Sequence, residues 1–231
     1  MPVFCLSDEI IFPKPELSRE DGLLAVGGDL SVARLILAYR MGIFPWYSLG
    51  EPVLWWSPDP RLVLYPDALH VSRSLMKTIK QDRFIVTLDR DFRQVIAACA
   101  GALRDKQPGT WITNDMMDAY CRLHEAGFAH SVEVWNRKEL AGGLYGVSLG
   151  KCFFGESMFA HQNNASKVGL VTLVHLLQKW SFHLIDCQVT TRHLIRLGAR
   201  EIPRKQFMAE LKLALKSPTR KGKWDAGEDT Q

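Results

Sequence analysis

The pattern of apolar and polar positions divides the chain into an irregular first quarter and a regular remainder. Residues 1–60 are rich in Pro, Trp and Gly, and they contain one helical pattern, at 31–41. Beyond residue 60, apolar residues spaced three or four apart indicate helices, and alternating apolar residues indicate strands. The predicted helices are 72–80, 92–100, 114–125, 166–180 and 204–216. The predicted strands are 84–89, 131–135, 140–148, 151–159 and 182–189.

These elements predict an α/β (α+β) fold. The three strands between residues 131 and 159 are joined by short turns, which is typical of an antiparallel meander, and a helix and another strand follow them. We place a domain boundary near residue 60. The expected organisation is a small N-terminal domain (1–60), a larger domain (61–216) and a disordered polar tail (217–231).

Composition narrows the class of protein. The chain has 231 residues, of which 47% are hydrophobic, and its apolar runs are far shorter than the ~20 residues of a membrane span. No secretion signal is recognisable at its start. The five cysteines are scattered and form no C-x-x-C pair. We therefore expect a cytoplasmic protein with no disulfide framework, no bound metal and no membrane contact.

Charge points to a polyanionic partner such as RNA. Residues 190–223 contain ten Lys or Arg against two Glu, and Arg73, Lys77 and Lys80 share one face of a predicted helix. For either cluster alone, a solvated helix surface is an equally good interpretation. Trp46, in a Gly-bounded loop, and Trp111 are suited to stacking on the bases of a single-stranded RNA end.

Two strands carry candidate chemistry. Asp186 and Gln188 share one face of strand 182–189 if that strand is regular, and polar side chains on an interior strand need hydrogen-bond partners. A satisfied buried network explains them as well as a catalytic pair does. Glu156 follows Gly155 inside an apolar run, and glycine there would permit close approach of a ligand or of another backbone. Ser157 is a weak nucleophile candidate, because the G-x-S-x-G pattern is absent.

Seven short motifs occur in order and are similar to those of bacterial leucyl/phenylalanyl-tRNA–protein transferases. They are GGD at 27–29, GIFPW at 42–46, LWWSPDPR at 54–61, GTWIT at 109–113, FGESMF at 154–159, NASK at 164–167 and IDCQ at 185–188. The resemblance extends from about residue 12 to about residue 207.

The resemblance implies a function. It implies transfer of Leu or Phe, and possibly Met, from aminoacyl-tRNA to the N-terminus of proteins that begin with Arg or Lys, which marks those proteins for degradation (the N-end rule). It implies a small N-terminal domain followed by a GNAT-like acyltransferase domain with a mixed, largely antiparallel sheet. It implies no metal and no other cofactor. We also expect the protein to be a monomer.

By the same resemblance, Asp186 and Gln188 are the catalytic pair. Gln188 would accept a hydrogen bond from the attacking amine, whereas Asp186 could orient that contact or act as the base. Glu156 is a candidate partner for the cationic acceptor. The candidate pocket for the transferred side chain comprises Phe153, Met158, Leu170, Leu173 and Ile185, although each of these apolar residues taken alone is more typical of plain core than of a pocket. The candidate tRNA-binding residues are Tyr39, Trp46, Arg73, Lys77, Lys80 and Trp111.

Two other functions are considered. An acyl-CoA-dependent N-acyltransferase of the same fold would carry a Gly-rich turn that binds pyrophosphate before the helix at 166, and residues 161–167 contain no glycine. A non-catalytic RNA-binding module would use only the basic residues and the tryptophans, and it gives no reason for a carboxylate and an amide on an apolar strand.

Overall fold

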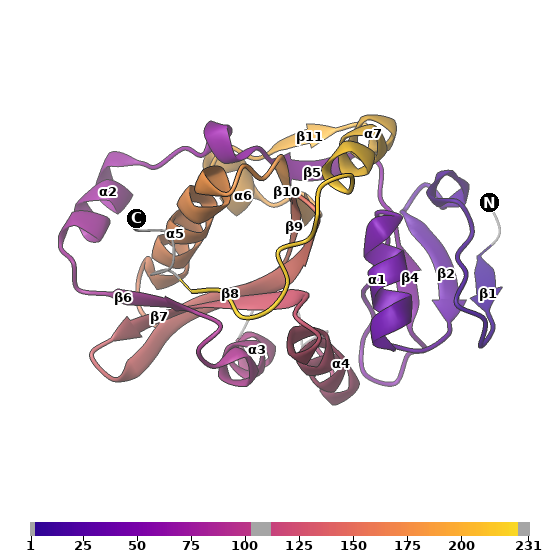
Figure 1. Ribbon diagram of the computed structural model, residues 1–231, viewed down its shortest axis with the longest axis horizontal. Coiled ribbons are helices and arrows are strands. Elements are labelled where there is room, and N and C mark those ends of the chain that lie inside the picture. Colours follow the sequence, from indigo (N-terminus) through magenta and orange to yellow (C-terminus); the bar gives the residue numbers. More distant parts are fainter. Residues whose placement is uncertain (1–2, 103–111, 226–231) are drawn as a thin grey trace.

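A computed structural model describes residues 3–102 and 112–225, and it contains two β-sheets. The smaller sheet has the order β1-β2-β4-β3. Its strands are β1 (Phe4–Leu6), β2 (Leu23–Gly27), β3 (Phe44–Pro45) and β4 (Leu54–Trp56). Helix α1 (Val32–Arg40) lies between this sheet and the rest of the molecule (Figure 1).

The larger sheet has the order β11-β5-β10-β9-β8-β7-β6, and every neighbouring pair is antiparallel except β9 and β10. Its strands are β5 (Arg61–Leu64), β6 (Ile85–Leu88), β7 (Ala129–Asn136), β8 (Glu139–Leu149), β9 (Cys152–Ala160), β10 (Leu184–Gln188) and β11 (Arg200–Ile202). The remaining helices are α2 (Arg73–Lys80), α3 (Phe92–Gly101), α4 (Asn114–Glu125), α5 (Ala165–Lys179), α6 (Arg192–Arg196) and α7 (Arg204–Ala214).

Helices cover both faces of the larger sheet. Helix α5 packs on one face over β7 and β8, while α3 and α4 pack on the other (Figure 1). The core beneath α3 and α4 continues into the smaller sheet and α1, so one apolar layer joins the two sheets. The predicted boundary at residue 60 falls where the chain leaves the smaller sheet and enters the larger one. The division into domains stays a prediction.

The predicted fold class is confirmed. The chain forms a mixed α/β structure with a largely antiparallel sheet, and every predicted helix and strand is present with bounds that agree within two residues. The meander β7-β8-β9, then α5 and β10, has the expected order. Strands β1 to β5, β11 and helix α6 were not predicted, because elements of two to five residues are too short to show a period. No helix in the described residues combines the length and the apolar character needed to cross a bilayer.

The prediction of a disordered tail is wrong for residues 217–225. The chain after α7 crosses the larger sheet (Figure 1). Trp224, in this segment, is 1% exposed. A single tryptophan among polar residues gives no periodic signal, yet its ring buries a large apolar surface. Residues 226–231 lie outside the described part of the chain.

Candidate active site

A cavity opens where the parallel strands β9 and β10 separate. The two strands pair at only three positions, from Leu184 opposite Cys152 to Asp186 opposite Phe154. Residues of both strands, from Phe153 and Ile185 onward, line a cavity of about 460 Å³. The five residues predicted to form the side-chain pocket all line it: Phe153, Met158, Leu170, Leu173 and Ile185. Their clustering supports the predicted apolar pocket.

Asp186 lies behind the cavity in a buried ion pair. Its side chain is fully buried and does not line the cavity. Arg61 Nε donates to Asp186 Oδ1 at 2.8 Å, and Arg61 Nη2 donates to Oδ2 at 2.6 Å. The Arg61 guanidinium also lies over the rings of Phe44 and Phe207, 4.8 and 4.6 Å from their centroids. Arg61 therefore holds the carboxylate with two parallel hydrogen bonds, which is a strong and directional arrangement.

A β-bulge separates Gln188 from Asp186. The pairing register with β5 shifts between these two residues, and Gln188 has a φ of +62°. Its backbone N–H donates to Asp186 Oδ1 at 2.9 Å. The prediction that the two side chains share one face is wrong, because the bulge interrupts the alternation of a regular strand. Gln188 lines the cavity, whereas Asp186 holds the Gln188 backbone from behind.

Glu156 is the one acidic side chain among the described residues that line the cavity. Its Oε1 accepts hydrogen bonds from Tyr39 Oη at 2.8 Å and Gln188 Nε2 at 2.7 Å, and its Oε2 accepts one from Tyr120 Oη at 3.0 Å. The Tyr39 and Tyr120 hydroxyls also contact each other; because each carries one proton, that contact is a hydrogen bond only when one of the two does not donate to an ionised Glu156. This network connects β9, β10, α1 and α4 at the cavity.

Burial and hydrogen bonding act on Glu156 in opposite directions. Burial disfavours the charged carboxylate and raises its pKa from 4.5 to about 7, although the three donors oppose that shift. Burial, together with the nearby carboxylate, raises the pKa of Tyr39 and Tyr120 well above the usual value. Both phenols therefore stay protonated and act as donors, while the carboxyl titrates near neutral pH.

The prediction that Tyr39 contacts tRNA is wrong. Its side chain is 1% exposed, and its hydroxyl already contacts Glu156 and Tyr120. In the sequence, Tyr39 precedes the basic residue Arg40 on a predicted amphipathic helix, and this neighbour is compatible with a position on a basic surface. In the structure, α1 turns Tyr39 into the core, so it supports the cavity from within.

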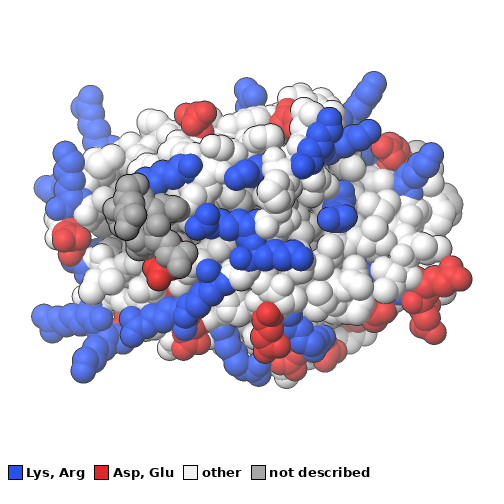
Figure 2. All heavy atoms as spheres, in the orientation of Figure 1, with Lys and Arg blue, Asp and Glu red and all other residues white. Residues whose placement is uncertain are grey.

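The other tRNA candidates lie apart. Trp46 is half-buried and lines the cavity, and its ring packs against Trp56 with 5.9 Å between centroids. Arg73, Lys77 and Lys80 are exposed on α2, away from the cavity lining. Lys and Arg gather over the end of the molecule that carries α2 and across its middle, whereas Asp and Glu gather toward the lower edge and the opposite end (Figure 2). Trp111 lies outside the described residues.

Two cavity residues that sequence analysis missed constrain the chemistry. Burial raises the pKa of the Cys187 thiol, so this cavity-lining cysteine is protonated and a poor nucleophile. His193, at the N-terminus of α6, also lines the cavity. Burial, together with Lys167 and Arg196, lowers its pKa, which leaves the ring neutral at pH 7. In the described part of the chain, no group of three His, Cys, Asp or Glu side chains is arranged to hold a metal ion.

Comparisons with known proteins identify related sequences. Residues 63–212 match the family model described as leucyl/phenylalanyl-tRNA protein transferase, and residues 28–59 match the model of its N-terminal domain. Three curated proteins named leucyl/phenylalanyl-tRNA–protein transferase are close relatives. The protein of Anaeromyxobacter sp. (strain Fw109-5) is 59% identical over 97% of this chain and 96% of its own. The protein of Desulfatibacillum aliphaticivorans is also 59% identical, over 97% and 96%. The protein of Myxococcus xanthus is 58% identical over 98% of both chains.

The fold was also compared with solved structures. A functionally unknown protein from Staphylococcus epidermidis is 8% identical, with a TM-score of 0.44 over 78% of this chain and 68% of that chain.

The contribution of the buried Arg61–Asp186 ion pair to stability can be tested by substitution. Arg61→Met leaves the Asp186 carboxylate buried and unpaired, so we expect a loss of about 3–5 kcal/mol in the free energy of unfolding. Adding Asp186→Asn removes the unpaired charge, and we expect the double variant to recover most of that loss. Urea unfolding at neutral pH measures both variants. A double variant no more stable than Arg61→Met would contradict the pairing.

Proposed function

Because this chain belongs to the leucyl/phenylalanyl-tRNA protein transferase family, we propose that it moves Leu or Phe, and also Met, from aminoacyl-tRNA to the N-terminal α-amino group of acceptor proteins. The acceptors begin with Arg or Lys, and the added residue marks them for degradation through the N-end rule. The protein acts as a monomer in the cytoplasm. The observation that carries the proposal is an apolar cavity with Glu156 and Gln188 side by side at its wall.

The apolar part of the cavity would bind the side chain of the donor amino acid. In this part of the cavity, the lining side chains from β9, β10 and α5 are apolar: Phe153, Met158, Leu170, Leu173 and Ile185. An apolar lining suits Leu, Phe and Met and excludes charged side chains. Trp46 would stack on the terminal adenine of the tRNA, because its ring is half-buried at the same cavity. The exposed cations of α2 would contact phosphates farther along the tRNA.

The proposed reaction is aminolysis of an ester. The neutral α-amine of the acceptor attacks the aminoacyl carbonyl carbon, the new C–N bond forms, the C–O bond to the ribose breaks, and the proton lost by the amine ends on the ribose oxygen. An α-amine has a pKa near ~8, so a useful fraction is neutral at pH 7. The ester is already an activated acyl donor. The reaction as written therefore needs neither a metal nor coenzyme A.

Gln188 is the catalytic residue that we assign to the amine. Its Nε2 donates to Glu156, so the amide orientation is fixed and Oε1 is left to accept a hydrogen bond from the attacking nitrogen. Positioning of that kind supplies much of the rate in a reaction whose nucleophile needs no strong base.

Asp186 is assigned as a positioning residue. Its carboxylate oxygens are engaged by Arg61 and by the backbone N–H of Gln188. A fully buried carboxylate that does not line the cavity is poorly placed to take a proton from substrate. The ion pair would instead hold the bulge that directs Gln188 into the cavity.

Glu156 is assigned to the cationic acceptor. Its three donors leave one lone-pair direction of Oε2 unoccupied. A carboxylate there attracts a guanidinium or an ammonium group, which accounts for a preference for Arg or Lys at the acceptor N-terminus.

Transfer itself is the first test. Leu-tRNA carrying labelled leucine, mixed with a peptide beginning with Arg, should give a labelled peptide, whereas a peptide beginning with Glu should not. Gln188→Ala should lower kcat about 100-fold, because the amine loses its orientation. Gln206→Ala, the same chemical change on the surface of α7, is the matched control. Labelled peptide formed at the wild-type rate by Gln188→Ala would refute the assignment of Gln188.

The pH dependence tests Glu156. Lowering the pH protonates both the acceptor amine and Glu156, whose pKa is about 7, and each protonation removes activity. Below pH 7, log(kcat/KM) for the wild type should fall with a slope approaching two. Glu156→Gln should have a lower kcat/KM and a slope approaching one, because only the amine still titrates. An unchanged slope in that variant would assign the second ionisation to another group.

Salt dependence tests the α2 surface. Replacing Arg73 and Lys77 by Ala should reduce the slope of log Kd for tRNA against log salt by about 1.5, as expected for two lost phosphate contacts. The control replaces Arg137 and Lys138, two exposed cations of the turn between β7 and β8, and should leave the slope unchanged. Equal slopes for the α2 variant and the wild type would show that α2 is not part of the tRNA-binding surface.

A further inference from the structure

The C-terminal strap, residues 215–225, follows a fixed path across the larger sheet. Gly150 N donates to Thr219 Oγ1 at 2.8 Å, and Gly222 N donates to the Gly127 carbonyl at 3.2 Å. A Cβ on Gly127 would lie 2.5 Å from Gly222 N, so the strap passes directly over that glycine. The yellow chain in Figure 1 runs from α7 across the sheet toward α5.

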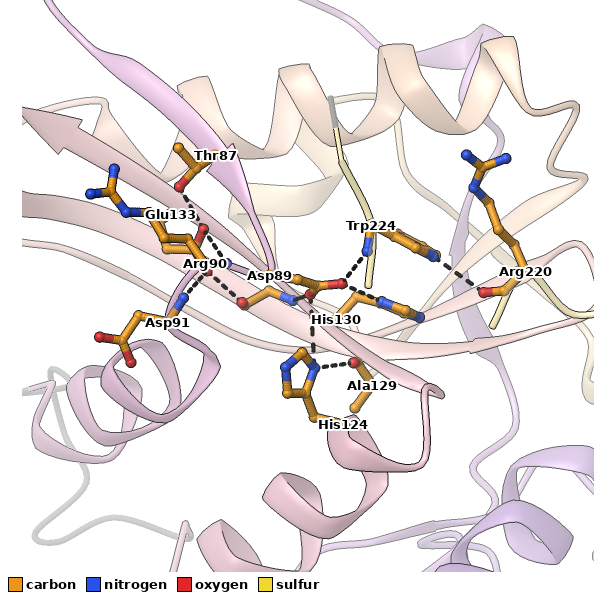
Figure 3. Close-up of polar contacts among 11 residues, drawn as sticks. Thr87, Asp89, Arg90, Asp91, His124, Ala129, His130, Glu133, Arg220 and Trp224 are labelled. Atoms are coloured by element: carbon orange, nitrogen blue, oxygen red, sulfur yellow. Dashed lines mark hydrogen bonds and ion pairs between the residues drawn. The ribbon is translucent and has the colours of Figure 1, made fainter. Parts of the chain in front are cut away.

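A buried carboxylate anchors the end of the strap. Trp224 N donates to Asp89 Oδ2 at 2.7 Å, and the same oxygen contacts His130 Nδ1 at 2.8 Å (Figure 3). Asp89 Oδ1 accepts from Ser131 N at 2.7 Å. The imidazole of His130 stacks on the Trp224 indole with 3.7 Å between centroids and 9° between planes. The main chain and the ring of Trp224 are therefore both fixed.

Trp224 packs behind a wall of the cavity. The ring centroids of Phe153 and Trp224 lie 6.0 Å apart, and only Phe153 lines the cavity. On another side, the Phe153 ring lies so close to Gly146 that a Cβ on Gly146 would be 2.6 Å away. Phe153 thus contacts both the β8 backbone at Gly146 and the Trp224 ring of the strap.

We propose that Trp224 is a specificity-determining residue that fixes the depth of the apolar pocket by holding Phe153 in the cavity wall. The inference rests on the proposed binding of the donor side chain in this cavity. If the indole is shortened, Phe153 can withdraw toward the strap and the pocket deepens. Phe, the longer donor side chain, then gains contact, while Leu loses contact with a wall that has moved away.

The test compares two donors with the full-length chain. For wild type, Trp224→Leu and Trp224→Phe, kcat/KM is measured with Leu-tRNA and Phe-tRNA and one Arg-initiated peptide. Trp224→Leu should raise the Phe-to-Leu ratio by about five-fold or more, the scale set by one methylene of pocket depth. Trp224→Phe keeps an aromatic ring against Phe153, so it should shift the ratio less and keeps the test valid if Trp224→Leu folds poorly.

A control separates pocket depth from general loss of stability. Val134→Ala removes two methyl groups from the same apolar layer, at a buried position that does not line the cavity. It should lower the Tm and leave the Phe-to-Leu ratio unchanged. If the Trp224 variants lower both kcat/KM values in equal proportion and leave the Phe-to-Leu ratio unchanged, Trp224 is a structural residue and the proposal is overturned.

A double-mutant cycle tests whether Trp224 acts on donor specificity through Phe153. Combining Trp224→Leu with Phe153→Leu should change the donor ratio little beyond the effect of Phe153→Leu alone, because the wall that Trp224 holds is already shortened. Independent, multiplying effects would overturn the proposal. Absence of transfer by the wild type would instead refute the proposed function. Failure of the proposed function can therefore be told apart from failure of the Trp224 proposal.

Discussion

A buried ion pair between Arg61 and Asp186 joins the parts of this molecule that must stay in register. Arg61 begins β5 of the larger sheet, and its guanidinium lies between Phe44 of the smaller sheet and Phe207 of α7. Asp186 lies on β10 and also accepts the backbone N–H of Gln188. Because two desolvated charges are tolerated only when they are well paired, this contact constrains both sheets, α7 and the bulge at once. The geometry of the cavity depends on it.

The Glu156 network shows which of two opposed effects prevails at that cavity. Three hydrogen-bond donors favour the carboxylate, yet burial outweighs them, and the pKa rises to about 7. The two tyrosines stay protonated and keep donating. As a result, one carboxylate fixes the Gln188 amide through Oε1 and remains partly charged around neutral pH. In the proposed function, this single side chain would supply charge for binding the acceptor and orientation for the attack.

Sequence analysis succeeded where side chains follow a regular period. The meander and the long helix both follow from alternation on strands and spacing on helices. It failed where the backbone departs from regularity. Nothing in IDCQ signals a bulge with a positive φ at Gln188, so Asp186 and Gln188 were expected on one face. Arg61 appeared only as the last letter of a motif, because an ion pair over a separation of 125 residues leaves no local pattern.

The strap is a second region where sequence analysis failed, and it contributes to the structure behind the cavity wall. Its polar composition predicts disorder, but the stability of a segment depends on the surface that it can bury rather than on its average polarity. Trp224 supplies that surface, and Asp89, at the end of β6, supplies an acceptor for its backbone N–H. The same indole contacts Phe153, a wall of the cavity. A residue seven positions from the end of the chain thus takes part in defining the cavity, because the wall that faces the substrate needs a rigid layer behind it.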